Sequence, residues 1–156
     1  MKILVLGSGA REHSLIMALA KENAHTLYAA PGNAGTVEWA ENVALDPTNK
    51  SVVAQIAKDL DVDLVVVGPE APLVAGVADA LKAENIPVFG PSHKAAAIEG
   101  SKSFAKDVMA AAGVPTGESE TVADEATLVA ALDRMGAPYV VKADGLAAGK
   151  GVLVTG

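Results

Sequence analysis

The segment from Lys142 to Gly151 combines two lysines with a run of small residues, KADGLAAGKG. Lys142 ends an apolar stretch, and Lys150 lies between Gly149 and Gly151. Such a loop can fold over a triphosphate and place Lys150 where charge develops during phosphoryl transfer. A P-loop is excluded because no hydroxyl residue and no helix follow the lysine. A solvated hairpin is the alternative, although it does not explain why alanine and glycine replace polar turn residues.

A second group of candidate residues follows the first apolar stretch. Gly7 and Gly9 precede Arg11, Glu12 and His13, which open a predicted helix. Free N–H groups and the dipole at a helix start favour an anion. The guanidinium adds a group that binds phosphate in a bidentate manner. The pattern indicates a phosphate site, with ordinary first-turn surface residues as the alternative.

The same glycines also suggest a dinucleotide site, which the neighbouring residues argue against. That fingerprint needs a third glycine where this chain has Glu12. It also needs an acidic residue near the end of the second strand, and this strand ends in Ala29, Ala30 and Pro31. NAD and FAD are therefore disfavoured.

Two further glycine-containing turns follow predicted strands. Asn33 lies between Gly32 and Gly35 and is suited either to a plain turn or to close contact with a sugar. Glu70 follows Gly68-Pro69, where its carboxylate is suited either to capping a helix or to accepting hydrogen bonds from sugar hydroxyls.

Composition narrows the class of protein. The 156 residues are 51% hydrophobic and 20% charged, which fits a folded core, and the net charge of −7 with no basic run argues against nucleic acid. Cysteine is absent, and three scattered histidines give no support for a zinc site. No apolar stretch approaches a membrane span, and the N-terminal one is too short for a signal peptide. A cytoplasmic protein without membrane or nucleic-acid partners is expected.

The elements that must position these residues alternate between two periods. Apolar runs at 3–6, 26–30, 64–67 and 87–89 predict buried strands, and helical spacing predicts helices at 11–22, 49–60 and from Pro72 to Leu81. This alternation predicts an α/β fold with a doubly wound parallel sheet. Ligands of such sheets bind at the carboxyl ends of the strands, where the turns after residues 6, 30 and 67 fall.

A second unit is predicted after Gly113. Residues 92–112 read as two helices broken near Gly100; a strand at 118–122, a helix at 124–135 and strands at 138–142 and 152–154 follow, with a hairpin turn at Gly156. Two strands and one helix bury little by themselves. The predicted domains are therefore residues 1–113 and an incomplete unit, residues 114–156.

Five ordered blocks are spread over the chain. They are Gly7-x-Gly9-x-Arg11-Glu12-His13, Pro31-Gly32-Asn33-Ala34-Gly35, Gly68-Pro69-Glu70-x-Pro72-Leu73-Val74-x-Gly76, Glu99-Gly100-Ser101-Lys102 and Lys142-Ala143-Asp144-Gly145-Leu146-Ala147-Ala148-Gly149-Lys150-Gly151. Together they resemble the phosphoribosylamine–glycine ligase (glycinamide ribonucleotide synthetase) family of the ATP-grasp superfamily. Another ATP-grasp ligase would share the domain order but not the first two blocks together. Ala10 departs from the resemblance, because the family commonly has glycine there.

The resemblance implies an enzyme of purine biosynthesis that ligates glycine to 5-phosphoribosylamine with ATP and Mg²⁺. Residues 1–113 would be the phosphoribosylamine-binding, Rossmann-like pre-ATP-grasp domain, and residues 114–156 the start of the ATP-grasp domain. The implied substrate-binding residues are Gly9, Ala10, Arg11, Glu12, His13, Asn33, Gly35, Glu70, Pro72 and Leu73. The implied nucleotide-binding residues are Lys102, Lys142, Gly149, Lys150 and Gly151, with Lys150 and Arg11 as catalytic residues.

The family's magnesium ligands are expected outside this chain, in a later segment, so that the chain is expected to be inactive unaided. A monomer is expected. A non-catalytic sugar-phosphate-binding module remains an alternative.

Overall fold

The computed structural model describes residues 1–147 and 149–155. Ala148, from the glycine-rich block, and Gly156, predicted as a hairpin turn, lie outside the described residues. The chain divides into two compact units, residues 1–96 and 97–156. The sequence instead predicted a domain boundary after Gly113. That boundary concerns which residues fold as separate domains, and it stays a prediction.

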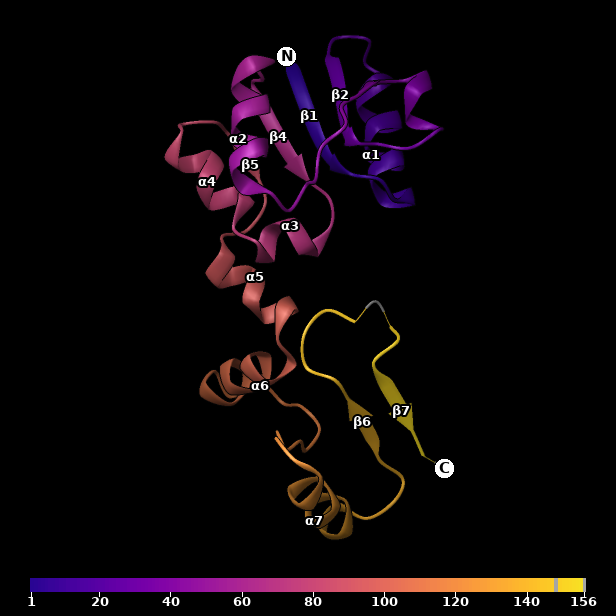
Figure 1. The fold of residues 1–156 in the computed structure, drawn as a ribbon, viewed down its shortest axis with the longest axis vertical. Coiled ribbons are helices and arrows are strands. Elements are labelled where there is room, and N and C mark those ends of the chain that lie inside the picture. Colours follow the sequence, from indigo (N-terminus) through magenta and orange to yellow (C-terminus); the bar gives the residue numbers. More distant parts are fainter. Residues whose placement is uncertain (148, 156) are drawn as a thin grey trace. The chain divides into compact units, whose positions relative to one another are not determined.

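The N-terminal unit is built on a five-stranded sheet in the order β3-β2-β1-β4-β5, with every pairing parallel (Figure 1). This confirms the predicted α/β parallel sheet. The strands are β1 (Lys2–Gly7), β2 (Thr26–Pro31), β3 (Glu41–Asn42), β4 (Leu64–Val67) and β5 (Val88–Phe89). The two-residue edge strand β3 is not apparent from the sequence, because it contains no apolar residue.

Both faces of the sheet are covered, which explains why β1 and β4 read as continuous apolar runs. One face packs Leu4 and Leu6 against α2 (Lys50–Asp59) and α4 (Val77–Ala83). The other packs Ile3 and Val5 against Ile16 of α1 (Ala10–Ala20). Each of these four strand residues is at most 2% exposed.

The helix predicted from Pro72 to Leu81 is wrong in one respect. The structure divides this segment into α3 (Glu70–Val74) and α4, with Gly76 between them at φ +85°. A left-handed residue interrupts the helical hydrogen bonds, and glycine adopts that conformation without strain. The sequence left Thr48 and Asn49 as alternative caps for α2, and the structure shows Asn49 in that place, its side chain accepting a hydrogen bond from the Val52 N–H.

The C-terminal unit contains α6 (Lys102–Ala111), α7 (Glu125–Met135) and an antiparallel pair, β6 (Val140–Lys142) and β7 (Val152–Val154). Helix α5 (His93–Gly100) runs across the division between the units, and its end confirms the predicted break near Gly100. The strand predicted at 118–122 is wrong. These residues are mostly exposed and pair with no neighbouring strand in the described part of the chain, and a strand needs such a partner.

Within residues 1–147 and 149–155, no helix has the length and apolar character needed to cross a membrane.

Candidate functional site

Three turns meet at the carboxyl edge of the sheet because β2, β1 and β4 are neighbours. Gly7 at the end of β1 pairs in register with Pro31, and Leu6 pairs with Val67. The Gly32 N–H donates to the Gly7 carbonyl at 3.2 Å. The sequence predicted that these turns follow strands, and the strand order brings them to one edge.

Arg11 joins the turn after β4 to the start of α1. Its Nη1 donates to the Gly68 carbonyl at 2.8 Å and to Glu70 Oε1 at 3.0 Å. Both side chains are largely exposed, 61% for Arg11 and 41% for Glu70. The pair therefore lies at the solvent-facing rim of the edge, where a ligand can reach it, and an exposed ion pair contributes little to stability.

Glu70 has a pKa below its ordinary value, because its own backbone N–H and then the Arg11 guanidinium donate hydrogen bonds to the carboxylate. A carboxylate with a depressed folded-state pKa stabilises the fold above its unfolded pKa, and that contribution is lost as pH falls through the folded value. Replacing Arg11 with alanine is expected to raise the Glu70 pKa only part of the way, since the backbone contribution remains. Carbon-detected NMR titration of the carboxyl groups measures this shift.

Asp46 is the internal control for that titration. Its pKa is also below its ordinary value, because the Thr48 hydroxyl and backbone N–H donate to it, with no contribution from Arg11. An Asp46 midpoint that moves in the Arg11→Ala variant, or a Glu70 midpoint that stays fixed, would contradict the assignment of cause.

Glu12 is buried, with only 4% of its surface exposed. Its Oε2 accepts a hydrogen bond from the Gly9 N–H at 2.7 Å, which closes the first turn of α1. A Cβ added at Gly7 would lie 2.6 Å from Glu12 Cγ, and one added at Gly9 would lie 2.9 Å from Oε2. These glycines therefore leave room for the Glu12 side chain itself.

Asn33 is held by an internal network rather than left open. Its Nδ2 donates to the Ser8 carbonyl at 3.0 Å, and its Oδ1 accepts from the backbone N–H groups of Gly35 and Thr36 at 2.8 and 3.1 Å. The side chain thus fixes the turn after β2 against the turn after β1.

Two residues of this network were missed from the sequence. Thr36 in the short 3₁₀ helix η1 (Thr36–Glu38) is fully buried, and its Oγ1 accepts from the Asn33 N–H at 2.8 Å. That hydroxyl also lies 2.7 Å from Oδ1 of Asn42, whose Nδ2 donates to the Asn33 carbonyl at 2.8 Å. A Thr and an Asn carry no sequence pattern of their own, so only the pairing of β3 with β2 could reveal them.

The remaining predicted substrate residues divide between surface and core. Ala10 is exposed at the start of α1, and half-buried His13 lies against Gly35, where an added Cβ would approach its ring at 2.5 Å. Pro72 is fully buried, and Leu73 packs against the core on the α2 side of the sheet. Pro72 and Leu73 therefore support the turn from within.

In the C-terminal unit, the glycine-rich loop connects β6 to β7. The Ala143 N–H donates to the Gly151 carbonyl at 2.8 Å, and the Lys150 N–H donates to the Ala147 carbonyl at 2.9 Å. Lys142 and Lys150 are both exposed, and Gly149 adopts φ +76°. The end of β6 and the loop thus each present one cation to solvent.

Lys102 lies at the start of α6 and reaches the same loop. Its Nζ donates to the Gly145 carbonyl at 2.6 Å, so this ammonium is already bound to the segment that carries Lys150. The structure therefore brings Lys102 to the loop that the sequence singled out, although 43 residues separate Lys102 from Gly145.

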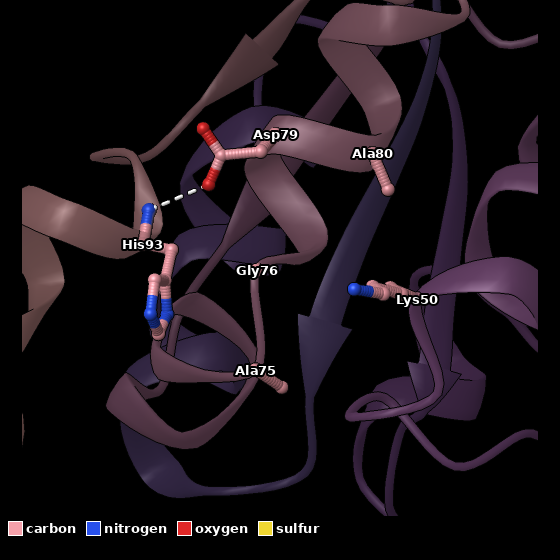
Figure 2. Close-up of a pocket in the computed structure, with 6 residues that line it drawn as sticks. All are labelled: Lys50, Ala75, Gly76, Asp79, Ala80 and His93. Carbon is pink, nitrogen blue, oxygen red and sulfur yellow. Dashed lines mark hydrogen bonds between the residues drawn. The ribbon is translucent and has the colours of Figure 1, made fainter.

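One open pocket of about 360 Å³ in the N-terminal unit contains none of the predicted site residues. Figure 2 shows the Lys50 amine and the His93 ring on opposite sides of it, with the His93 N–H donating to Asp79 Oδ2 at 2.6 Å. In the described ranges, no group of three or more His, Cys, Asp or Glu side chains could hold a metal ion.

Comparison with known proteins gives a consistent result along the chain. The phosphoribosylglycinamide synthetase N-domain family matches residues 1–99, and the ATP-grasp (A) domain of the same synthetase matches residues 100–156.

Phosphoribosylamine–glycine ligases of Leifsonia xyli and Streptomyces coelicolor are 60% and 58% identical over 99% of the chain. The solved structure of the Thermotoga maritima ligase superposes with a TM-score of 0.78 at 32% identity, covering 99% of this chain and 36% of that one. The chain spans 38% of the length of the two curated relatives. Since a family domain matches most of its residues, the chain belongs to the phosphoribosylglycinamide synthetase family.

Proposed function

We propose that this chain contributes the phosphoribosylamine-binding unit, and the first part of the ATP-binding unit, to a cytoplasmic ATP-dependent carbon–nitrogen ligase of purine biosynthesis. The reaction joins glycine to 5-phosphoribosylamine and yields glycinamide ribonucleotide, ADP and phosphate. The observation that carries the proposal is the Arg11–Glu70 pair at the edge where three turns meet, in a chain of this family.

The two charges of that pair suit the two ends of a sugar phosphate. Of the Arg11 donors, only Nη1 makes hydrogen bonds within the described part of the chain, so Nη2 and Nε can bind phosphate oxygens. Glu70 Oε2 can accept from a sugar hydroxyl, and its lowered pKa keeps it ionised for that role. The free N–H groups at the start of α1 favour the same phosphate.

In this proposal Gly9 and Asn33 have a structural role, unlike Arg11 and Glu70, which bind the sugar phosphate. The Gly9 N–H donates to Glu12, and the Asn33 amide is engaged with Ser8, Gly35 and Thr36, so both hold the turns in place. Ala10 and His13 line the same edge. Positioning by a rigid scaffold is the main contribution that a ligase of this kind needs for its sugar phosphate.

The chemistry proceeds in two transfers. The glycine carboxylate attacks the γ-phosphorus of ATP to give glycyl phosphate and ADP, and the amine of phosphoribosylamine then displaces phosphate and loses a proton to form the amide. Lys102, Lys142 and Lys150 would stabilise the nucleotide's phosphates, with Gly149 and Gly151 allowing the loop to approach them closely. Mg²⁺ would neutralise phosphate charge, and the family resemblance implies that its ligands lie in a later segment outside this chain.

Calorimetric titration with ribose 5-phosphate, a stable substitute for the labile amine, tests the sugar-phosphate site. The wild-type chain is expected to bind saturably, and Arg11→Ala is expected to weaken binding by about tenfold or more, because a charge-assisted hydrogen bond is worth about 1.5–3 kcal/mol. Glucose 6-phosphate in place of ribose 5-phosphate checks selectivity for the sugar.

Arg134→Ala is the matched control, because Arg134 is also an exposed arginine paired with a glutamate, Glu120, but lies in the C-terminal unit. It should bind ribose 5-phosphate as the wild type does. Equal binding by the Arg11→Ala variant would remove Arg11 from the phosphate site, and absence of binding by the wild-type chain would refute the site as a property of this chain.

A further inference from the structure

The carboxylate of Asp144 lies at the first turn of α6 and accepts hydrogen bonds from residues about 40 positions earlier. Its Oδ1 accepts from the Lys102 N–H at 2.6 Å, and its Oδ2 accepts from the hydroxyls of Ser103 at 2.7 Å and Ser101 at 3.0 Å. These contacts all lie within the C-terminal unit. A carboxylate at this position also complements the helix dipole.

Gly145, the residue after Asp144, makes a further hydrogen bond to Lys102 of α6. The Gly145 carbonyl accepts from Lys102 Nζ at 2.6 Å, and the Gly145 N–H donates to Asp144 Oδ1 at 2.9 Å. Gly145 adopts φ +90°, a conformation that glycine tolerates and other residues rarely adopt. The Lys102 main chain and side chain are therefore both tied to one dipeptide of the glycine-rich loop.

We propose that Asp144 is a positioning residue, which fastens the glycine-rich loop to the first turn of α6 and thereby fixes the Lys102 ammonium against the loop that carries Lys150. The proposal rests on the proposed nucleotide role of these lysines for its functional meaning. Without Asp144, the hydrogen bond from the lysine side chain, which has many rotamers, would be the one left between α6 and the described residues of the loop.

The ionisation of Asp144 fits this role. The Ser103 hydroxyl, and then the Lys102 N–H, hold the pKa of Asp144 well below its usual range. The carboxylate is therefore charged at neutral pH, and hydrogen bonds to a charged acceptor are stronger than those between neutral groups.

The test is competitive labelling of lysines with limiting acetic anhydride, read by mass spectrometry without any nucleotide. Lys102 is expected to react more slowly than Lys142, because the Lys102 amine donates a hydrogen bond to the Gly145 carbonyl, whereas the exposed Lys142 amine makes none within the described residues. Asp144→Ala is expected to raise the Lys102 to Lys142 ratio about 3- to 10-fold, as the net worth of a hydrogen bond implies. Asp144→Asn keeps one acceptor oxygen for the Lys102 N–H and should restore part of the wild-type ratio.

Asp107→Ala is the matched control, since Asp107 is an exposed aspartate of α6 that makes no side-chain hydrogen bond in the described part of the chain. Its ratio should equal that of the wild type. An unchanged ratio in Asp144→Ala, or an equal change in Asp107→Ala, would overturn the positioning role. Circular dichroism of each variant, showing a retained helix signal, confirms that local release rather than unfolding is measured.

Repeating the labelling with ADP separates this proposal from the proposed function. Protection of Lys102, Lys142 or Lys150 by ADP in the wild type, weakened in Asp144→Ala, supports both. Absence of protection by ADP overturns the nucleotide role of these lysines in this chain, whereas the positioning role is decided by the ratio measured without ADP.

Discussion

Replacing Gly68 with alanine is expected to destabilise the N-terminal unit by about 1–3 kcal/mol, the range for overpacking a well-packed site. The added Cβ would lie 2.5 Å from Cγ and 2.7 Å from Cδ of Glu12. Glu12 is 4% exposed and bound to the Gly9 N–H, so its side chain cannot move aside easily. Urea unfolding followed by fluorescence of Trp39, the single tryptophan, measures the change within this unit.

A double-mutant cycle provides the control for this steric explanation. In a Glu12→Ala background the new methyl group has space, so the same Gly68→Ala change is expected to cost less than about 0.5 kcal/mol. Equal costs in both backgrounds would contradict the explanation. The non-additivity would show that Gly68 accommodates the Glu12 side chain.

Replacing Thr36 with valine is expected to destabilise the same unit by about 1–3 kcal/mol, because it leaves buried polar groups without partners. Valine has the same shape, but it cannot accept from the Asn33 N–H or donate toward Asn42 Oδ1. Ribose 5-phosphate binding should weaken as well, because the turn after β2 loses the contacts that fix it. Urea unfolding and calorimetric titration measure the two effects.

Thr26→Val is the matched control for that substitution. Thr26 begins β2 in an exposed position, and its hydroxyl makes no hydrogen bond in the described residues. The change in unfolding free energy should therefore stay within about 0.5 kcal/mol. A Thr36→Val variant as stable as the Thr26→Val variant would mean that the buried hydroxyl contributes nothing to the turn.

The local sequence was sufficient to predict most helices and strands of this chain. β1 and β4 were predicted because a strand buried on both faces is apolar at every position. The starts of α2 and α7 were predictable because Asn49 and Asp124 cap them with their own side chains. Two predictions failed. The helix through Gly76 is interrupted because that glycine adopts a left-handed conformation, and residues 118–122 form no strand because they pair with none in the described part of the chain.

The sequence supplied candidate residues for the site but not their arrangement. Arg11, Glu70 and the glycine-rich loop were candidates because their types suit phosphate and sugar, and Lys102 was a candidate only through the family resemblance. The sequence did not indicate that Arg11 pairs with Glu70 or that Lys102 binds the Gly145 carbonyl, contacts that join residues 59 and 43 positions apart.

The sequence by itself thus determined the parallel α/β sheet, the turns that follow its strands and the family resemblance, because these depend on short-range patterns of apolar residues and glycine. The tertiary structure alone decided that Glu12 is buried, that Thr36 and Asn42 hold the Asn33 turn, and that Asp144 binds the first turn of α6. The physical reason is that each of these roles depends on which strands and loops become neighbours, and polar side chains carry no periodic pattern that reveals their distant partners.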